Sequence, residues 1–222
     1  MVSSESLQES MSLNVKICGI TDLADARFCA GAGADYLGFI QYLKSPRYIR
    51  AEVAAQLVQW VHGPQCVGVF VNEDAPQVNR LAELADFDCV QLHGDEAPEL
   101  CERIERPVIK ALRIAPHTDN DAVRAQMDSY LPFVDTFLLD TWEQDVWGGT
   151  GRSFDWHIAR SLARDFPVLL SGGIGAHNVI CASQQVRPLG IDLSSSLESR
   201  PGKKDFDKVA AFFQVLKTAG YT

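Results

Sequence analysis

Reactive side chains stand at the ends of several short apolar stretches of this sequence. Cys18 closes NVKIC, His93 closes DCVQLH and Asp140 closes DTFLLD. A thiol, an imidazole and a carboxyl can each exchange a proton or hold a ligand. A single buried cysteine is more often a small hydrophobic residue, and an aspartate after a strand is more often the cap of the next helix. The three residues carry chemistry only if the fold brings these ends together.

Two turns rich in glycine or serine follow later apolar stretches and predict an anion site. LLSGGIGAHNV places Gly172 and Gly173 between a strand and a helix, and IDLSSSLESRPG places Ser194 and Ser195 after the next strand. Glycine lets main-chain N–H groups approach a phosphate, and serine hydroxyls add donors. One glycine turn alone would indicate no more than a sharp bend. Two in succession match the recurrent phosphate position after strands seven and eight of a barrel.

The elements that must position these residues alternate along the chain. Short apolar runs rich in Val, Ile, Leu and Phe are separated by longer stretches of helical period. The eight runs are NVKIC, DYLGFI, CVGVFV, DCVQLH, PVIKALR, DTFLLD, PVLLS and GIDLS. The clearest helical stretches between and after them are DLADARFCAGAG, RAEVAAQLVQWV, PQVNRLAELAD and FDKVAAFFQVLKTAG.

This alternation predicts an α/β fold, a (β/α)8 TIM barrel of eight parallel strands with outer helices. Strands joined through helices are parallel, and runs that are apolar throughout are covered on both faces. The alternative is an open doubly wound sheet, which usually carries G-x-G-x-x-G after its first strand, whereas CGITDLAD follows here. GAGAD at 31–35 precedes a strand, so its glycines are expected to end a helix. In a barrel, the residues that close the strands form one rim.

Composition indicates one domain and excludes several classes of partner. The chain has 222 residues, 46% of them hydrophobic, which suits a single barrel over residues 14–222. The polar start, residues 1–13, has no secretory pattern and is expected to be a flexible extension. A net charge of −9 argues against nucleic acid, and no apolar run is long enough for a membrane span. We expect a cytoplasmic protein with no membrane partner.

The cysteines and histidines predict neither disulfides nor a metal. Six cysteines in a core-rich chain without an export signal are expected to be free thiols. Neither C-x-x-C nor a histidine pair at helical ligand spacing occurs, because all five histidines are scattered singly. No metal site is predicted.

Taken together, these strand ends resemble a known family. From about Val15 to Phe213 the chain is similar to phosphoribosylanthranilate isomerase of tryptophan biosynthesis. The resemblance rests on KICGI, GFI with KSPRYI, VGVFVN, VQLHGDE, VIKALR, LLDTW with GGTGRSFDW, LLSGGI with HNV, and GIDLSSSLES with PGKKD, in that order. It implies an isomerase without metal or organic cofactor whose partner is a small phosphosugar substrate. The protein is then expected to be a monomer or a homodimer.

The family's reaction is an Amadori rearrangement of N-(5-phosphoribosyl)anthranilate to the 1-deoxyribulose 5-phosphate derivative. An acid protonates the furanose oxygen to open the ring, and a base removes the C2 proton from the resulting iminium. The resemblance assigns the base to Cys18 and the acid to Asp140. A thiol with a reference pKa of roughly 8.5 needs a positive neighbour to act as a base, and Lys16 is the nearest cation in sequence. In a strand Lys16 shares a face with Cys18, where an ammonium is costly unless paired.

The resemblance also assigns binding roles. It places Arg47 against the anthranilate carboxylate, which a guanidinium grips through two hydrogen bonds. His93 is expected to orient the substrate, although a packed structural histidine is the alternative. Asp192 is expected to bond substrate hydroxyls or to hold the loop after the eighth strand. The segment GGTG, Gly148–Gly151, is expected to be a mobile loop that covers the site.

The sequence departs from the family pattern at two places. Ser196 stands where the family usually has glycine, so a position that needs positive φ or a close phosphate has gained a side chain. Gln41 and Tyr42 replace a more usual apolar and aromatic pair. Two other functions stay open: a non-catalytic phosphosugar-binding barrel, and the related aminoaldose isomerase of histidine biosynthesis. The latter resembles a two-aspartate site, and NVKICGI has no acidic residue.

Overall fold

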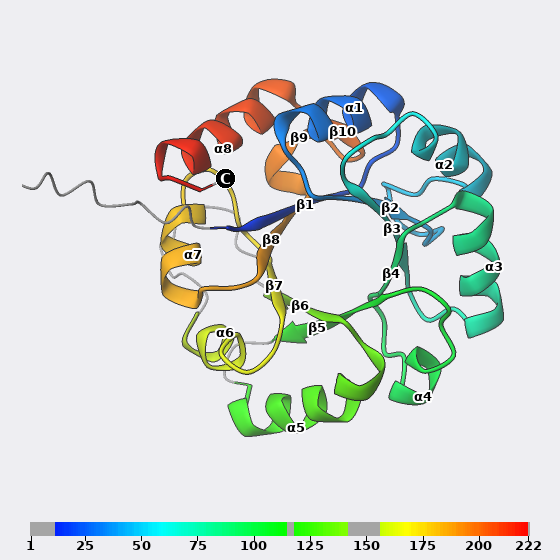
Figure 1. The fold of residues 1–222 in the computed structure, drawn as a ribbon, viewed down its shortest axis with the longest axis vertical. Coiled ribbons are helices and arrows are strands. Elements are labelled where there is room, and N and C mark those ends of the chain that lie inside the picture. The colour runs from blue at the N-terminus through cyan, green and yellow to red at the C-terminus, as the bar shows by residue number, and fades with distance from the viewer. Residues whose placement is uncertain (1–11, 115–117, 142–155, 222) are drawn as a thin grey trace, which may run out of the picture.

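Eight parallel strands close into a barrel (Figure 1). The computed structural model describes residues 12–114, 118–141 and 156–221. The strands are β1 (Asn14–Cys18), β2 (Tyr36–Ile40), β3 (Gln65–Phe70), β4 (Cys89–Leu92), β5 (Val108–Ile114), β6 (Thr136–Thr141), β7 (Val168–Ser171) and β8 (Gly190–Leu193). Each strand pairs with the next one in sequence, and β8 pairs with β1. The predicted (β/α)8 architecture is confirmed.

Helices form an outer ring around the strands (Figure 1). They are α1 (Leu23–Ala32), α2 (Ala51–Val58), α3 (Ala75–Ala85), α4 (Pro98–Cys101), α5 (Asn120–Tyr130), α6 (Trp156–Leu162), α7 (Val179–Val186) and α8 (Phe206–Thr218). Aspartate side chains cap the first turns of α1, α3, α5 and α8. Gly33 ends α1 with φ 113°, as the GAGAD segment predicts. None of the helices in the described part of the chain combines the length and apolar character needed to cross a bilayer.

Alternation along the strands sorts the side chains into two cores. The smaller core fills the barrel and contains Val67, Cys89, Ile109, Ala111, Leu138 and Leu169. The larger core lies between strands and helices and includes Val15, Ile17, Leu37, Phe39, Phe70 and Phe137. Because successive strand residues face opposite sides, Lys16 and Cys18 of β1 and Asp140 of β6 face the barrel interior. The residue order of each strand therefore decides which side chains face the barrel interior and lie at the carboxyl rim.

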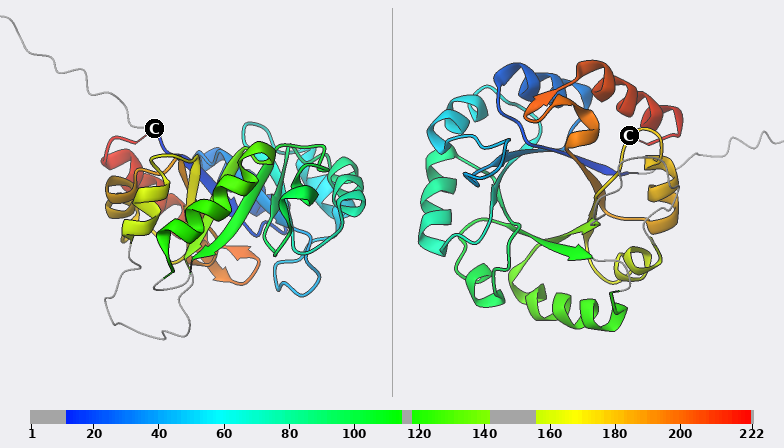
Figure 2. Two further views of the ribbon diagram at one scale, coloured as in Figure 1. Left: turned by 90° about the horizontal axis from the view of Figure 1, so that it is seen from below. Right: turned by 180° about the vertical axis from the view of Figure 1, so that it is seen from behind.

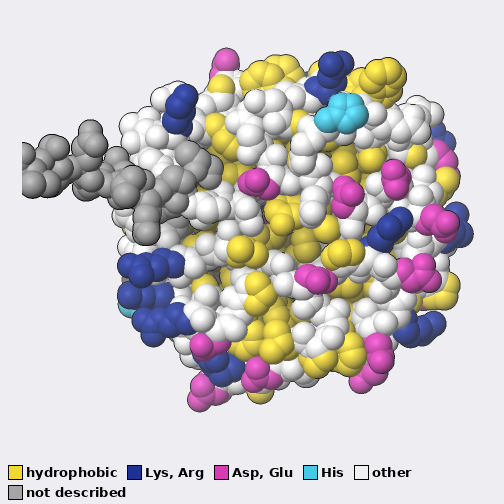
Figure 3. All heavy atoms as spheres, in the orientation of Figure 1, with side chains coloured by type: hydrophobic (Ala, Val, Ile, Leu, Met, Phe, Trp, Pro, Cys, Tyr) yellow, Lys and Arg dark blue, Asp and Glu magenta, His cyan; other side chains and the backbone are white. Residues whose placement is uncertain are grey.

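Aspartates lock the strand starts at the amino end of the barrel, the face seen in Figure 3. Asp35, Asp88 and Asp135 stand just before β2, β4 and β6. Each accepts a main-chain N–H of the preceding strand, from Val15, Cys66 and Val108, at 2.7, 2.7 and 2.9 Å. Figure 3 shows acidic side chains scattered around a hydrophobic centre on this face. These bonds fix the register at the end opposite the predicted site.

Three features were not predicted from the sequence. Short 3-10 helices occupy η1 (Leu131–Phe133) and η2 (Ser195–Leu197). After η2, the strands β9 (Glu198–Arg200) and β10 (Lys203–Lys204) form an antiparallel hairpin. In the left view of Figure 2 this hairpin, in orange, projects from the barrel end opposite the C-terminus. Leu13, placed in the N-terminal extension above, is buried in the larger core.

Candidate active site

The carboxyl ends of the strands bring the predicted site residues to one rim, which faces the viewer in the right view of Figure 2. Cys18 ends β1, His93 follows β4 and Asp140 lies near the end of β6. The glycines after β7 and the serines after β8 complete the ring. Because the barrel is closed and all its strands are parallel, residues separated by more than a hundred positions share one pocket mouth.

Two glycines make room for the side chains of Cys18 and Arg47. A β-carbon at Gly38 of β2 would lie 2.8 Å from Cys18 Sγ, so the thiol occupies the space that a side chain would fill. Gly19 has φ 84°, and a β-carbon there would lie 2.7 Å from Cδ of Arg47. Positive φ and close approach both require glycine after Cys18. Cys18 is itself 7% exposed.

A buried ion pair lies beneath Cys18. Lys16 Nζ donates to Asp192 Oδ1 at 2.8 Å, and the Lys16 side chain is fully buried. Ser171 Oγ donates to the other Asp192 oxygen at 3.2 Å. Although burial opposes it, the Asp192 carboxylate raises the pKa of Lys16, so the ammonium stays charged. The Lys16 charge that was expected to be costly in the barrel is thus paired, and both Asp192 oxygens have protein donors.

The Cys18 thiol itself is not ionised by these neighbours. Burial raises the pKa of Cys18, while the positive charge of Lys16 lowers it in part and Asp192 raises it. Cys18 is therefore a thiol rather than a thiolate at neutral pH. The expected positive neighbour is present, but burial outweighs it.

His93 lies between Gln91, which faces the barrel interior, and Asp140. Gln91 Nε2 donates to His93 Nδ1 at 2.8 Å, which places the imidazole proton on Nε2. That nitrogen lies 3.4 Å from Asp140 Oδ2, which is a long contact for a hydrogen bond. The side chains of His93 and Asp140 are 23% and 32% exposed, so both reach the pocket mouth. Gln91 was not singled out from the sequence, although it faces inward two residues before His93.

Arg47 is held by a carboxylate of the β9–β10 hairpin. Its Nε lies 2.9 Å from Glu198 Oε1 and its Nη2 lies 2.6 Å from Glu198 Oε2. Hydrogen bonding to Glu198 raises the pKa of Arg47, whose side chain is 20% exposed. The sequence analysis missed Glu198. The charges around the RPG turn, with Glu198 on one side and Lys203 and Lys204 on the other, were the available signal.

The two predicted anion turns lie side by side. Gly172 and Gly173 have φ of 84° and 64°, which only glycine adopts readily. A β-carbon at Gly175 would lie 3.4 Å from Cβ of Ser196, so the turns after β7 and β8 touch. Ser195 is exposed, and Ser194 is partly exposed. Ser196 lies in η2 and is not among the described non-glycine residues with positive φ, so its backbone is not strained in that way, and its effect on phosphate affinity stays a prediction.

The remaining cysteines are free thiols, as the sequence predicts, although Cys181 is exposed and does not pack as a buried hydrophobic residue. All six cysteines are free thiols, and Cys29, Cys66, Cys89 and Cys101 are buried. Burial raises the pKa of Cys29 to about 12 and that of Cys101 to about 11. Within the described ranges, no group of three His, Cys, Asp or Glu residues could hold a metal ion. The GGTG segment at 148–151 lies outside the described residues.

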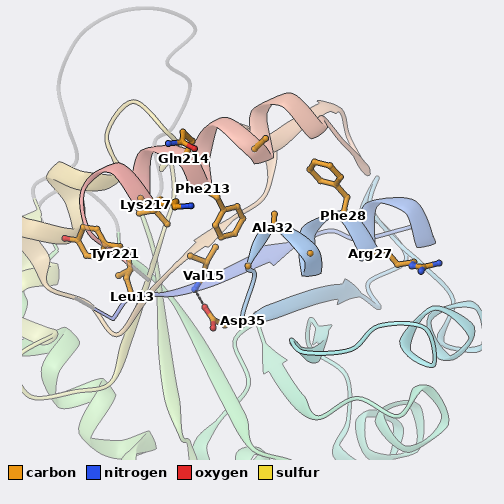
Figure 4. Close-up of a pocket in the computed structure, with 14 residues that line it drawn as sticks. Leu13, Val15, Arg27, Phe28, Ala32, Asp35, Phe213, Gln214, Lys217 and Tyr221 are labelled. Atoms are coloured by element: carbon orange, nitrogen blue, oxygen red, sulfur yellow. Dashed lines mark hydrogen bonds between the residues drawn. The ribbon is translucent and has the colours of Figure 1, made fainter. Parts of the chain in front are cut away.

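One hollow in the described part of the chain lies away from the rim. It has a volume of about 680 Å³ and lies on the outside of the barrel between α1 and α8 (Figure 4). Phe28 and Ala32 of α1 face Phe213 and Lys217 of α8 across it. It contains none of the rim residues, so it is separate from the predicted site.

Comparison with known proteins decides the family. A sequence profile described as N-(5'-phosphoribosyl)anthranilate (PRA) isomerase matches residues 15–215. The chain belongs to this isomerase family. The N-(5'-phosphoribosyl)anthranilate isomerase of Pelobacter propionicus is 43% identical over 206 residues, which cover 92% of this chain and 96% of that one.

Solved structures of the isomerase family share this barrel. The phosphoribosyl anthranilate isomerase of Thermotoga maritima aligns with a TM-score of 0.82 and 40% identity, covering 93% of this chain and 99% of that one. A second structure contains reduced 1-(o-carboxyphenylamino)-1-deoxyribulose 5-phosphate. It aligns with a TM-score of 0.80 and 38% identity, covering 93% of this chain and 99% of that one. The family expected from the strand-end motifs is confirmed.

Proposed function

We propose that the rim converts N-(5'-phosphoribosyl)anthranilate to 1-(2-carboxyphenylamino)-1-deoxyribulose 5-phosphate with Cys18 as the base and Asp140 as the acid. The chain is an isomerase of tryptophan biosynthesis, as its family membership establishes. The observation that supports the residue roles is the shared position of Cys18 and Asp140. Both face inward at the same end of one closed barrel, from β1 and β6. A sugar bound across the mouth would have one group on each side.

Asp140 acts first, by protonating the furanose oxygen so that the ring opens to an iminium. Its carboxyl is partly exposed at the mouth, where it can meet the sugar. His93 Nε2 lies 3.4 Å from Oδ2, close enough to hold the carboxylate that remains after proton transfer. His93 is thus placed to orient the acid and the substrate together, and the bond from Gln91 fixes its tautomer.

Cys18 then removes the C2 proton. In the protein without substrate, burial raises the pKa of this thiol, and the Lys16 charge opposes that effect. A cationic iminium beside Cys18 adds a further positive charge, which favours the thiolate when the base is needed. Lys16 stays ionised through its pair with Asp192. Asp192 holds this ammonium and accepts a hydrogen bond from Ser171, and its roles toward substrate hydroxyls and the loop after β8 stay predictions.

The ends of the substrate have separate binding groups. Arg47 would grip the anthranilate carboxylate, and Gly172, Gly173, Ser194 and Ser195 would hold the phosphate through main-chain N–H and hydroxyl groups. The partner is therefore a small phosphosugar. A relative from Thermotoga maritima is described as a dimeric isomerase from which monomers were generated, so a monomer or a homodimer is proposed here.

The test is the decay of substrate fluorescence on mixing with the protein. The wild type is expected to turn over N-(5'-phosphoribosyl)anthranilate, and Cys18→Ser and Asp140→Asn are each expected to lower kcat by about 10²–10⁴. Binding of the reduced product analogue should survive in both variants. If all three proteins are equally inert while the analogue binds, the barrel is a phosphosugar-binding protein instead.

A further inference from the structure

The β9–β10 hairpin places a buried carboxylate between the binding and proton-transfer parts of the rim. The Glu198 side chain is 3% exposed. Its oxygens accept hydrogen bonds from Arg47 at 2.6–3.1 Å, from Lys204 Nζ at 3.0 Å and from Gly202 N at 3.3 Å. Although burial opposes ionisation, hydrogen bonds from Arg47 and the charge of Lys204 lower the pKa of Glu198. A carboxylate so placed is fixed in position and in charge.

Lys204 ties this carboxylate to two neighbouring strand ends. Its side chain is fully buried, and Nζ donates to Cys18 O at 2.7 Å, to Ser194 O at 3.3 Å and to Glu198 at 3.0 Å. An ammonium has three donors, and each has an acceptor here. The hairpin thus holds the main chain at the ends of β1 and β8, and Glu198 is the anion that keeps Lys204 paired.

Arg47 is engaged along one edge only. Its Nε and Nη2 groups bind Glu198, and no bond to Nη1 is found among the described residues. The planar guanidinium can therefore present its other edge, Nη1 with Nη2, to a second carboxylate. All three donors of Lys204 have acceptors, so Arg47 is the cation here that keeps an edge without a bond among the described residues, and this edge can take an anionic ligand.

We propose that Glu198 is the positioning residue that orients Arg47 for the carboxylate of the aromatic end of the substrate. This inference rests on the proposed function, because it assigns Arg47 to that carboxylate. Without the fork to Glu198, the long Arg47 side chain has many rotamers, and its approach to Gly19 no longer fixes one of them. Binding of the substrate carboxylate must then also offset the loss of conformational entropy as Arg47 becomes ordered, which weakens the affinity.

A double-mutant cycle tests whether Glu198 acts through Arg47. Glu198→Gln keeps the shape and removes the charge, while Arg47→Met keeps the apolar stem over Gly19. Glu198→Gln is expected to raise KM for N-(5'-phosphoribosyl)anthranilate at least tenfold. In the Arg47→Met background, the same change is expected to alter KM less than threefold. A merely structural role would give the same loss in both backgrounds and would overturn the proposal.

A second ligand separates positioning from general damage. Ribose 5-phosphate has the phosphate and the sugar but no aromatic carboxylate, so its inhibition constant should stay within twofold in Glu198→Gln. A parallel loss for both ligands would contradict the proposal. Lys203→Met is the matched control, because Lys203 lies on the same hairpin but bonds to Asp22 and Asp25 at 2.8 and 2.6 Å, away from Arg47. Its KM should stay within twofold of wild type.

Glu198→Asp keeps the test decisive if the glutamine variant does not fold. It retains the charge but is one methylene shorter, so it cannot keep both arms of the fork, and the same KM increase with unchanged ribose 5-phosphate inhibition is expected. An active wild type whose KM is unaffected by either substitution refutes this inference alone. An inert wild type refutes the proposed function and this inference together.

Discussion

Replacing Lys16 separates its effect on stability from its effect on Cys18. Lys16→Met removes a fully buried ammonium whose Nζ lies 2.8 Å from Asp192 Oδ1. Asp192, which is 7% exposed, is then left charged with Ser171 as its donor. Breaking a buried pair by removing one partner costs about 3–5 kcal/mol. For a chain of this length that predicts a Tm lower by about 6–20 °C.

The same substitution should shift the pH dependence of turnover. Lys16 opposes the effect of burial on the pKa of Cys18, so its removal raises that pKa further. Turnover requires the thiolate, so kcat/KM rises with pH as Cys18 loses its proton. A higher Cys18 pKa should therefore move this ascending limb of the kcat/KM profile to higher pH. At a fixed pH below that limb, kcat/KM should fall about tenfold or more.

A second buried lysine provides the matched control. Lys110 of β5 is 1% exposed and pairs with Glu96 at 2.8 Å, but its other bonds go to Leu92 O and Gly94 O. Lys110→Met should cost similar stability without moving the ascending limb. Thermal unfolding and pH profiles of both variants make the comparison. If the two profiles match, or if Lys16→Met leaves the limb in place, the reasoning about Cys18 is wrong.

Three further outcomes are expected. Asp88→Ala removes the hydrogen bond from Cys66 N at the amino end of the barrel. It should lower the free energy of unfolding in urea by about 1–3 kcal/mol, with kcat/KM unchanged. Loss of activity in a folded variant would contradict the expectation that this end of the barrel takes no part in turnover. Gly38→Ala places a methyl group 2.8 Å from Cys18 Sγ and should displace the thiol. We expect kcat to fall by at least about tenfold while the far-ultraviolet circular dichroism spectrum stays native. Full activity would show that turnover does not depend on the observed position of the thiol. Despite burial, Lys110 and Arg47 hold the pKa values of Glu96 and Glu198 below the ordinary 4.5. Since the unfolded chain then binds more protons, their contribution to stability is present above pH 4.5 and is lost as pH falls through the lowered pKa values. The urea midpoint should therefore drop as pH falls below 4.5; a constant midpoint there would refute it.

The barrel and the principal rim residues could be predicted because local patterns encode them. Each of the eight apolar runs became a strand within a residue or two of its predicted ends. Parallel strands in a closed ring then require that Cys18 and Asp140 meet at one end. These inferences need only periodicity and strand direction.

The partners of those residues could not be predicted in the same way. Lys16 and Asp192 are Cα partners in the β1–β8 ladder, and Arg47 meets Glu198 across 151 positions. The first contact depends on the register of β1 and β8. The second depends on a short hairpin that has no apolar run by which it could be predicted. The raised pKa of Cys18 is likewise a consequence of burial, which competes with the Lys16 charge and is not readable from sequence spacing.

In the proposed mechanism one substrate spans the rim between Cys18 and Asp140. A crystal structure with the reduced product analogue would test this arrangement most directly. The ligand's carboxylate is expected on Arg47, its phosphate on the glycines after β7 and the serines after β8, and its first two sugar carbons between Cys18 Sγ and the Asp140 carboxyl. An analogue bound in the hollow between α1 and α8, or bound at the rim with its sugar carbons away from either group, would contradict it.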